Sequence, residues 1–239
     1  MIDQSFNLAS GRTLGSNYKV VELLGSGWEG EVYKVIEQHT GIIRAAKLFY
    51  LRDTPREAPL RRYARKLHKL RSCPIIIQYH HRDRTRIRGR DIEFLVSDLA
   101  DGEMLSSFLE RRRAKRLPVF EALHLIYALA KGVEQIHFLG EYHGDIHSDN
   151  VMVKKRGLGF EVYLLDFLDL GRATREKIQN DVYLIISLLY EILGGAREYH
   201  RLDKEVKSVV LGNKRNLISR RYKTAGHLRL ALENLTWEA

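Results

Sequence analysis

Short apolar runs broken by glycines mark the first part of the chain. Residues 18–24, 31–38 and 42–50 each mix apolar and polar positions over a short span, and glycine-containing turns separate them. Runs of this length bounded by turn residues are typical of strands, so the pattern predicts an antiparallel meander of three strands. Residues 60–70 contain no helix breaker and carry apolar residues at helical spacing, which predicts a basic helix.

Two further apolar runs follow that helix, at residues 75–79 and 92–99. They predict two more strands, with a basic loop at residues 82–90 between them. Residues 1–100 therefore predict a first domain, or N-lobe, built from a five-stranded antiparallel sheet and one helix.

Helical patterns dominate residues 101–239, which predicts a second, mainly helical domain, or C-lobe. Residues 104–113 predict a short helix, and residues 119–139 predict a long one whose apolar stripe faces a core. A small strand pair around a Lys-Lys-Arg-Gly turn comes next. Residues 181–193 are apolar on nearly every side, as in a buried helix, and residues 224–235 predict the last helix. The whole order of elements predicts an α+β fold.

The composition agrees with a chain that buries a core, since 44% of its 239 residues are hydrophobic. Cys73 is the single cysteine, which permits no internal disulfide and suits a reducing compartment. The first residues lack the basic and apolar segments of a secretory signal, and the longest apolar stretch, residues 182–193, is too short to cross a bilayer. We therefore expect a cytoplasmic protein without a membrane span.

Positive charge is in excess, with 40 Lys and Arg against 30 Asp and Glu and a net charge of +10. The excess gathers at residues 61–66, 82–90, 111–116 and 214–223. Such runs most often form solvated faces, but they also attract anions such as nucleotides, nucleic acid or acidic proteins. An anionic partner on these basic surfaces stays open at this point.

A glycine-rich stretch, Gly-Ser-Gly-Trp-Glu-Gly-Glu-Val, joins two of the expected strands at residues 25–32. A dinucleotide-binding turn joins a strand to a helix, so this context favours a glycine-rich hairpin whose backbone can approach phosphates closely. A hairpin that only needs positive φ angles is the alternative. Lys47 follows on the next strand after Ala45 and Ala46, and by itself it could be an edge residue in water. Hairpin and lysine together indicate a lid and a cation for the α- and β-phosphates of ATP.

The clearest chemical signal is His-Gly-Asp-Ile-His-Ser-Asp-Asn at residues 143–150, followed by Asp166 at the end of an expected strand. Phosphoryl transfer from ATP needs Mg²⁺, oxygen ligands to hold it, and a carboxylate that orients and deprotonates the attacking hydroxyl. Asp145 is the candidate for that carboxylate, and Asn150 and Asp166 are candidate metal ligands. Two acidic turns on a small hairpin are the structural alternative.

Taken in order, these motifs resemble those of the protein-kinase-like superfamily over residues 18–235. The resemblance implies a two-lobed fold, ATP and Mg²⁺ as cofactors, Asp145 as catalytic base, and Lys47 as the lysine that pairs with the phosphates. Asp98 matches the acidic hinge position, and Asp181 resembles the aspartate that anchors the catalytic loop. The residues that the resemblance assigns to the nucleotide are Gly25, Ser26, Gly27, Gly30, Val32, Ala45, Lys47, Asp98 and Asp166.

The catalytic loop departs from that of most protein kinases, because it reads His-Gly-Asp-Ile-His. In this it is similar to aminoglycoside and choline phosphotransferases and to RIO-type kinases. His147 stands where a catalytic lysine would touch the γ-phosphate, so it joins Asp145, Lys47 and Asn150 in the catalytic set.

Two other departures concern regulation. No Ala-Pro-Glu sequence occurs between Asp166 and Asp181, so the usual activation segment and peptide-docking loop are essentially absent. The expected helix of the first lobe carries Ala64 where a glutamate would pair with Lys47, and Glu57 could replace that glutamate only if the helix begins early.

We therefore expect an ATP- and Mg²⁺-dependent phosphotransferase, and a Ser/Thr protein kinase without a normal activation segment fits best. A small-molecule alcohol kinase of the aminoglycoside or choline type is the runner-up, supported by the His-Gly-Asp-Ile-His loop. A pseudokinase or nucleic-acid-binding scaffold that uses the basic surfaces is the third reading.

Overall fold

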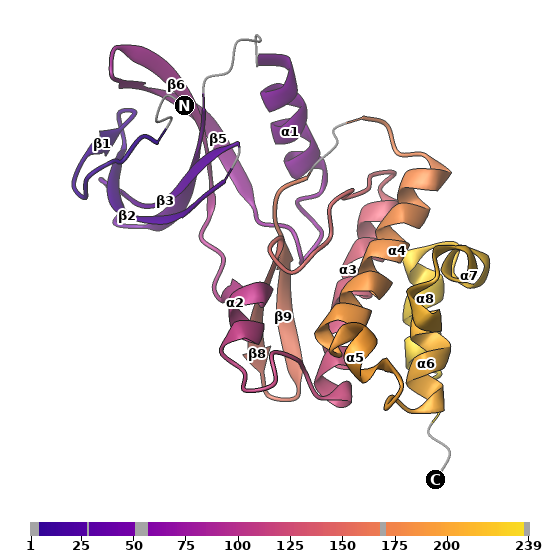
Figure 1. Cartoon of the computed structure of the whole chain (residues 1–239). Helices are drawn as coiled ribbons and strands as arrows, with labels where there is room; N and C mark the ends of the chain where they lie inside the picture. The colour runs from indigo at the N-terminus through magenta and orange to yellow at the C-terminus, as the bar shows by residue number, and fades with distance from the viewer. Residues whose placement is uncertain (1–4, 28, 51–56, 168–170, 237–239) are drawn as a thin grey trace. The chain divides into compact units, whose positions relative to one another are not determined.

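The structure is a computed structural model that describes residues 5–27, 29–50, 57–167 and 171–236, and at residues 57–59 it describes the backbone alone. The chain divides into two compact units (Figure 1). The first unit combines Met1–Arg71 with Ile77–Ala100, and the second combines Ser72–Ile76 with Asp101–Ala239. A sheet-rich first unit and a mainly helical second unit make the α+β fold that the sequence predicts.

A six-stranded antiparallel sheet in the order β1-β2-β3-β4-β6-β5 forms the centre of the first unit. Its strands are β1 (Thr13–Leu14), β2 (Tyr18–Ser26), β3 (Gly30–Glu37), β4 (Ile43–Phe49), β5 (Tyr79–Ile87) and β6 (Arg90–Asp98), and helix α1 (Glu57–Lys69) contacts β5. The meander and the basic helix are as expected. The sheet has one strand more than the five expected, because β1 is only two residues long and too short to show an alternating pattern.

The fourth expected strand is wrong in its position. Ile76, in the middle of residues 75–79, belongs to the second unit and forms an isolated bridge to Leu164. The expected basic loop is mostly strand β5, which lies at the edge of the sheet and pairs with β6. An edge strand leaves positions in contact with water, so charged residues such as Arg84, paired with Glu93 at 2.9 Å, replace the apolar residues of an inner strand.

The core of the first unit includes residues from the segment that precedes the sheet. Phe6 is 9% exposed and packs with the apolar side chains of the sheet. Its backbone N–H donates to Glu31 at 2.9 Å, and Ser5 and Tyr50 donate their hydroxyls to the same carboxylate at 2.8 and 3.0 Å. Tyr33 is a fourth donor to Glu31. Glu31, which directly follows the glycine-rich hairpin, is thus a buried carboxylate satisfied by neutral donors.

Burial and hydrogen bonding act in opposite directions on Glu31. Burial alone raises the pKa of its carboxyl group, but the bonds from Tyr33, Ser5, Phe6 and Tyr50 outweigh burial and hold the pKa below its usual range. Burial and the bond to Glu31 raise the pKa of Tyr33 to about 12. The folded first unit therefore favours an ionised Glu31 beside a protonated Tyr33.

The second unit contains a small sheet in the order β7-β8-β9 and a set of helices. The strands are β7 (Glu103–Met104), β8 (Val151–Arg156) and β9 (Gly159–Leu164). The α-helices are α2 (Leu105–Glu110), α3 (Val119–Phe138), α4 (Arg175–Ile192), α5 (Gly195–Tyr199), α6 (Lys204–Val210), α7 (Arg215–Arg221) and α8 (Ala225–Glu233), with a short 3₁₀ helix at Leu211–Asn213. The expected hairpin around the Lys-Lys-Arg-Gly turn is confirmed as β8 and β9.

Helices α3 and α4 form the centre of the second unit, and each has a row of fully buried apolar residues. Helix α4 begins at Arg175, earlier than the expected residue 181. The sequence prediction missed this start because the first turn of the helix is polar and shows no apolar pattern. Thr174 marks that start, since its hydroxyl accepts a hydrogen bond from the backbone N–H of Lys177 at 3.3 Å. Of the helices in the described residues, none has both the length and the apolar character needed to cross a membrane.

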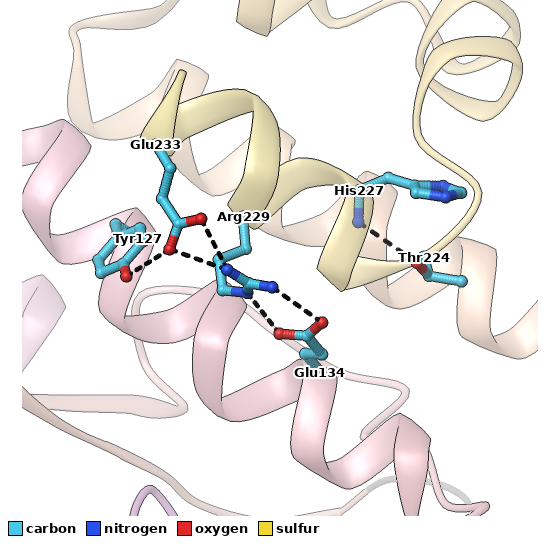
Figure 2. Close-up of polar contacts among 6 residues, drawn as sticks. All are labelled: Tyr127, Glu134, Thr224, His227, Arg229 and Glu233. Atoms are coloured by element: carbon cyan, nitrogen blue, oxygen red, sulfur yellow. Dashed lines mark hydrogen bonds and ion pairs between the residues drawn. The ribbon is translucent and has the colours of Figure 1, made fainter. Parts of the chain in front are cut away.

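Arg229 on the last helix, α8, forms a hydrogen-bonded ion pair with α3 (Figure 2). Its guanidinium donates to Glu134 on α3 at 2.6 Å and to Glu233 on α8 at 2.7 Å, and Tyr127 of α3 donates its hydroxyl to Glu233 at 2.8 Å. At the start of α8, the hydroxyl oxygen of Thr224 accepts a hydrogen bond from the backbone N–H of His227, in the first turn of the helix. The expected last helix is thus joined to the centre of the second unit.

Candidate active site

Asp181 on α4 holds the start of the His-Gly-Asp loop. Its side chain is completely buried, and it accepts the backbone N–H groups of His143 and Gly144, each at 2.8 Å. His137, near the end of α3, contacts the same carboxylate through Nε2 at 3.0 Å. These bonds fix the backbone immediately before Asp145 to two central helices.

His143 joins this loop to the segment that follows β9. Its Nε2 lies 2.8 Å from the backbone oxygen of Leu165, and its Nδ1 accepts the backbone N–H of Asp145 at 3.2 Å. A neutral ring with its proton on Nε2 satisfies both contacts. The buried Phe167 lies against the ring, with centroids 4.7 Å apart. The residues on both sides of Asp166 are therefore tied to the loop that carries Asp145.

Asn150 connects the two candidate metal-binding segments to Asp145. Its Nδ2 donates to the backbone oxygen of Asp145 at 2.9 Å and to its carboxylate Oδ2 at 3.0 Å. The backbone N–H of Leu165 donates to the backbone oxygen of Asn150 at 2.9 Å. Asn150 is 9% exposed, so the amide side of these bonds is shielded from water. Asp166, next in the chain after Leu165, has a left-handed backbone with φ of 49°.

His147 lies beside Asp145 in the same loop. Its Nε2 is 3.4 Å from Oδ2 of Asp145, and its Nδ1 accepts the backbone N–H of Asp149 at 3.2 Å. The side chains of His147 and Asp145 are 43% and 39% exposed. Both can therefore be reached from solvent, unlike the buried groups that hold the loop.

The glycine-rich hairpin joins β2 to β3, as the sequence predicts. Gly25 pairs with Val32 and Ser26 with Glu31, and the N–H of Gly27 donates to the backbone oxygen of Gly30 at 2.9 Å. A Cβ added at Gly30 would lie 1.8 Å from the backbone oxygen of Leu48, so only glycine fits there. No atom of the described residues beyond the chain neighbours lies within 4 Å of a Cβ added at Gly25 or Gly27, so that part of the hairpin is open with respect to them.

Lys47 lies on β4 opposite Val32. Ala46 and Leu48 point into the core of the first unit, and strand alternation therefore puts Lys47 on the other face, together with Ala45. The Nζ atom of Lys47 forms an ion pair at 2.9 Å with Glu29, a residue of the glycine-rich hairpin. Glu29 is not among the partners of Lys47 that were expected from the sequence. The side chain of Glu57, the partner considered from the sequence, lies outside the described residues.

Asp98 ends β6 and uses its carboxylate within the first unit. It forms an ion pair with Arg44 of β4 and contacts Nε2 of His80 on β5 at 2.7 Å. The carboxylate therefore connects β6 to both neighbouring strands, β4 and β5.

The second unit thus brings Asp145, His147 and Asn150 into one hydrogen-bonded loop, joined through Leu165 to Asp166. The first unit brings Lys47 to the glycine-rich hairpin. Sequence reasoning missed Glu29, the support from His137, and the carboxylate network of Glu31. For Glu29, the sequence offered one signal, which is the presence of a glutamate within the glycine-rich stretch.

Comparison with known proteins agrees with this architecture. Residues 18–199 match the protein kinase domain family, so the chain belongs to that family. Over 191 residues it is 29% identical to a putative cyclin-dependent kinase F-2 of Oryza sativa subsp. japonica, an alignment that covers 77% of this chain and 57% of that protein. The chain thus spans little more than half the length of this curated relative.

Solved structures show the same two-lobed fold. The kinase domain of Mycobacterium tuberculosis PknI superposes with a TM-score of 0.66 and 22% identity, over 96% of this chain and 100% of that one. A double mutant of the PknI kinase domain gives a TM-score of 0.68 with 22% identity, over 95% and 98% of the two chains. At this identity the likeness concerns the fold, which is the two-lobed α+β fold expected from the sequence.

Proposed function

We propose that this chain transfers the γ-phosphoryl group of ATP to the hydroxyl of a Ser or Thr side chain in a protein substrate. The observation that carries the proposal is the hydrogen-bonded chain from Asp145 through Asn150 to Leu165, directly before Asp166. It gathers two carboxylates and an amide at one end of β8 and β9, and phosphoryl transfer uses groups of these types. Membership in the protein kinase domain family supports the same reaction.

Asp145 is the residue that we assign to the acceptor hydroxyl. It orients the hydroxyl and takes its proton while the oxygen bonds to the γ-phosphorus and the bond to the bridging oxygen of ADP breaks. Asn150 and His147 both contact Oδ2 of Asp145, so we assign Oδ1 to the acceptor. We assign His147 to the γ-phosphate, in the role that the resemblance gives to a lysine in most protein kinases.

Asn150 and Asp166 are the residues that we assign to Mg²⁺. Because Nδ2 of Asn150 is bonded to Asp145, the amide oxygen Oδ1 is the atom suited to a cation, and Asp166 adds carboxylate oxygens. Magnesium is commonly held by one or two carboxylates together with phosphate oxygens and water, and when bound it neutralises phosphate charge. Within the described ranges no three His, Cys, Asp or Glu side chains form a metal cluster, which fits a site completed by phosphates.

The first unit supplies the groups that we assign to the nucleotide. Lys47 provides a positive charge for the α- and β-phosphates, and the open hairpin provides backbone N–H groups that phosphates can approach. The proposed nucleotide-binding residues are Gly25, Ser26, Gly27, Gly30, Val32, Ala45, Lys47, Asp98 and Asp166. Asp98 takes part through its backbone, since its carboxylate is bonded to Arg44 and His80.

A protein acceptor is favoured by the family match, and the His-Gly-Asp-Ile-His loop favours a small alcohol as the second candidate. Helix α4 begins at Arg175, so only a short segment follows Asp166 before it. This supports the proposal that the chain lacks a normal activation segment and is not switched on by phosphorylation there.

The acceptor can be tested with γ-labelled ATP and Mg²⁺. We expect label in protein-bound phosphoserine or phosphothreonine when a mixture of unfolded proteins or random Ser/Thr peptides is offered. Equal amounts of aminoglycoside and choline serve as competing acceptors. Label that appears only in a small alcohol would replace the protein acceptor with the second candidate, and absence of transfer to any acceptor, with nucleotide still bound, would favour a scaffold.

A further inference from the structure

We propose that Arg172 and Arg175, at the start of α4, determine specificity by selecting protein acceptors with acidic residues beside the Ser or Thr. This inference rests on the proposed function and names the class of substrate that the same site takes. That class is a peptide segment rich in Asp or Glu around the acceptor hydroxyl.

The first two turns of α4 lie against the residues that lead into the His-Gly-Asp loop. Nζ of Lys177 donates to the hydroxyl of Tyr142 at 2.9 Å, and it lies 4.7 Å from the centre of the same ring. One turn further along α4, Asp181 accepts the backbone N–H groups of His143 and Gly144, each at 2.8 Å. These contacts all lie within the second unit, so the start of α4 is held beside this part of the chain.

The proposed base lies close to that start in the chain. Asp145 is the third residue after Tyr142, and three residues of fully extended chain span at most about 11 Å. An extended peptide substrate advances about 3.3 Å per residue. When the hydroxyl of such a peptide reaches Asp145, residues a few positions away from the acceptor therefore come near the first turn of α4.

Positive side chains gather at the start of α4. Arg172 precedes the helix, Arg175 and Lys177 lie in its first turn, and Glu176 is the one acidic residue among residues 171–177. Arg172 and Arg175 are both exposed. Helix stability does not account for this charge, because the first turn of a helix favours acidic residues over basic ones. Attraction of a negative group outside the helix does account for it.

The His-Gly-Asp loop itself has the opposite charge. It carries Asp145 and Asp149, whose side chains are 39% and 71% exposed. These carboxylates repel an acidic acceptor unless positive groups lie near, and Arg172 and Arg175 supply such groups. A guanidinium can pair with a carboxylate through two parallel hydrogen bonds, and it repels the Lys or Arg of a basic acceptor. The charges beside the loop therefore fit an acidic segment.

The test uses three peptides that share one Ser and differ in the residues around it, which are Glu, Gln or Lys. With the wild-type protein we expect kcat/KM for the Glu peptide to exceed that for the Gln peptide about tenfold, mainly through KM, which is the size of effect that a few exposed ion pairs give together. This advantage should shrink at high salt, because salt screens exposed charges. Arg175→Glu should abolish the advantage, and Arg172→Glu should reduce it. A glutamate suits the first turn of a helix, so Arg175→Glu should fold as well as the wild type.

Arg197→Glu is the matched control, since it makes the same change in net charge. Arg197 is exposed on α5, beyond the other end of α4, whose 18 residues span about 27 Å. This variant should keep the preference for the Glu peptide. A wild-type protein that does not prefer the Glu peptide to the Gln peptide would overturn the inference. Equal effects of Arg175→Glu and Arg197→Glu would overturn it too, because net charge alone would then explain the preference.

A Glu peptide with Ala in place of the Ser separates this inference from the proposed function, because its binding needs no phosphate transfer. Fluorescence anisotropy should give a Kd for the wild type about tenfold lower than for Arg175→Glu. If this difference is present but no peptide accepts phosphate, the selection of acidic segments is supported and the proposed function is contradicted. If the two Kd values coincide while peptides are phosphorylated, the proposed function stands and the inference is overturned.

Discussion

Asn150 donates its side-chain amide to both the backbone oxygen and the carboxylate of Asp145, at 2.9 and 3.0 Å. One residue thereby fixes the proposed base and, through its remaining oxygen, can face a cation. The proposed roles of Asn150 therefore couple the orientation of the proposed base to the binding of the proposed metal.

Asn150→Ala removes both contributions, so we expect kcat to fall at least about tenfold, since a hydrogen bond to a charged group is worth about 1.5–3 kcal/mol. The Mg²⁺ concentration for half-maximal rate should rise at the same time. Initial rates across a magnesium titration measure both effects. Asn180→Ala on α4, where the side-chain oxygen accepts a hydrogen bond from Arg215, is the control. A fall in kcat without any change in the titration would limit Asn150 to holding Asp145.

Asp166→Asn keeps the shape of the side chain but removes a negative charge from the proposed metal site. We expect a higher Mg²⁺ requirement, because the neutral amide is a weaker ligand for this cation than a carboxylate. Binding of ATP in the absence of Mg²⁺ should change little. A magnesium titration that coincides with the wild-type curve would remove Asp166 from the metal site.

Asp181→Ala should destabilise the second unit by about 3 kcal/mol, because three hydrogen-bonding groups around a completely buried carboxylate lose their partner. Urea unfolding followed by circular dichroism measures this loss. Asp203→Ala removes an exposed aspartate from the start of α6, where it makes no side-chain cap, and should have little effect. Equal stability of Asp181→Ala and Asp203→Ala would mean that the bonds from Asp181 to the His-Gly-Asp loop do not stabilise the second unit.

Glu31 and Tyr33 predict how the stability of the first unit changes with pH. The pKa of Glu31 is lowered on folding, so its stabilisation is complete above the unfolded pKa and is lost as pH falls through the folded pKa. The pKa of Tyr33 is raised to about 12, so its stabilisation is complete below the unfolded pKa and is lost as pH rises toward that value.

Glu31→Gln should lower the free energy of unfolding at neutral pH by about 2 kcal/mol, because hydrogen bonds to a charged group become bonds to a neutral one. It should also flatten the dependence on pH below about 5, and Tyr33→Phe should flatten the alkaline side. Urea titrations at several pH values give both slopes. An unchanged acid dependence in Glu31→Gln would show that other carboxylates dominate it.

The candidate active site could be predicted from the sequence to the extent that it is local. Asp145, His147 and Asn150 lie within one loop, and a loop so short must bring them together once its ends are fixed. The strand that ends before Asp166 was visible as an apolar run. The chemical types of these residues then indicated phosphoryl transfer before any distance was known.

Other features depend on register and on contacts distant in sequence. Strand β5 was mistaken for a loop because an edge strand can carry charge where an inner strand carries apolar residues. Contact between Glu29 and Lys47 requires the exact alignment of β3 with β4, which an alternating pattern does not define. The bond from Arg229 to Glu134 joins residues on two helices far apart in the chain, and many other basic residues could have filled that role.

The intact mass of the purified protein after incubation with Mg²⁺ and ATP, measured beside Asp145→Asn and with a Ser/Thr peptide mixture present, tests the central claim most directly. We expect phosphate on the chain or on the peptides with the wild-type protein, and a rate lower by at least about 10²-fold with Asp145→Asn while ATP still binds. Equal rates of phosphate transfer by the two proteins would contradict the assignment of Asp145 as the base and, with it, this account of the site.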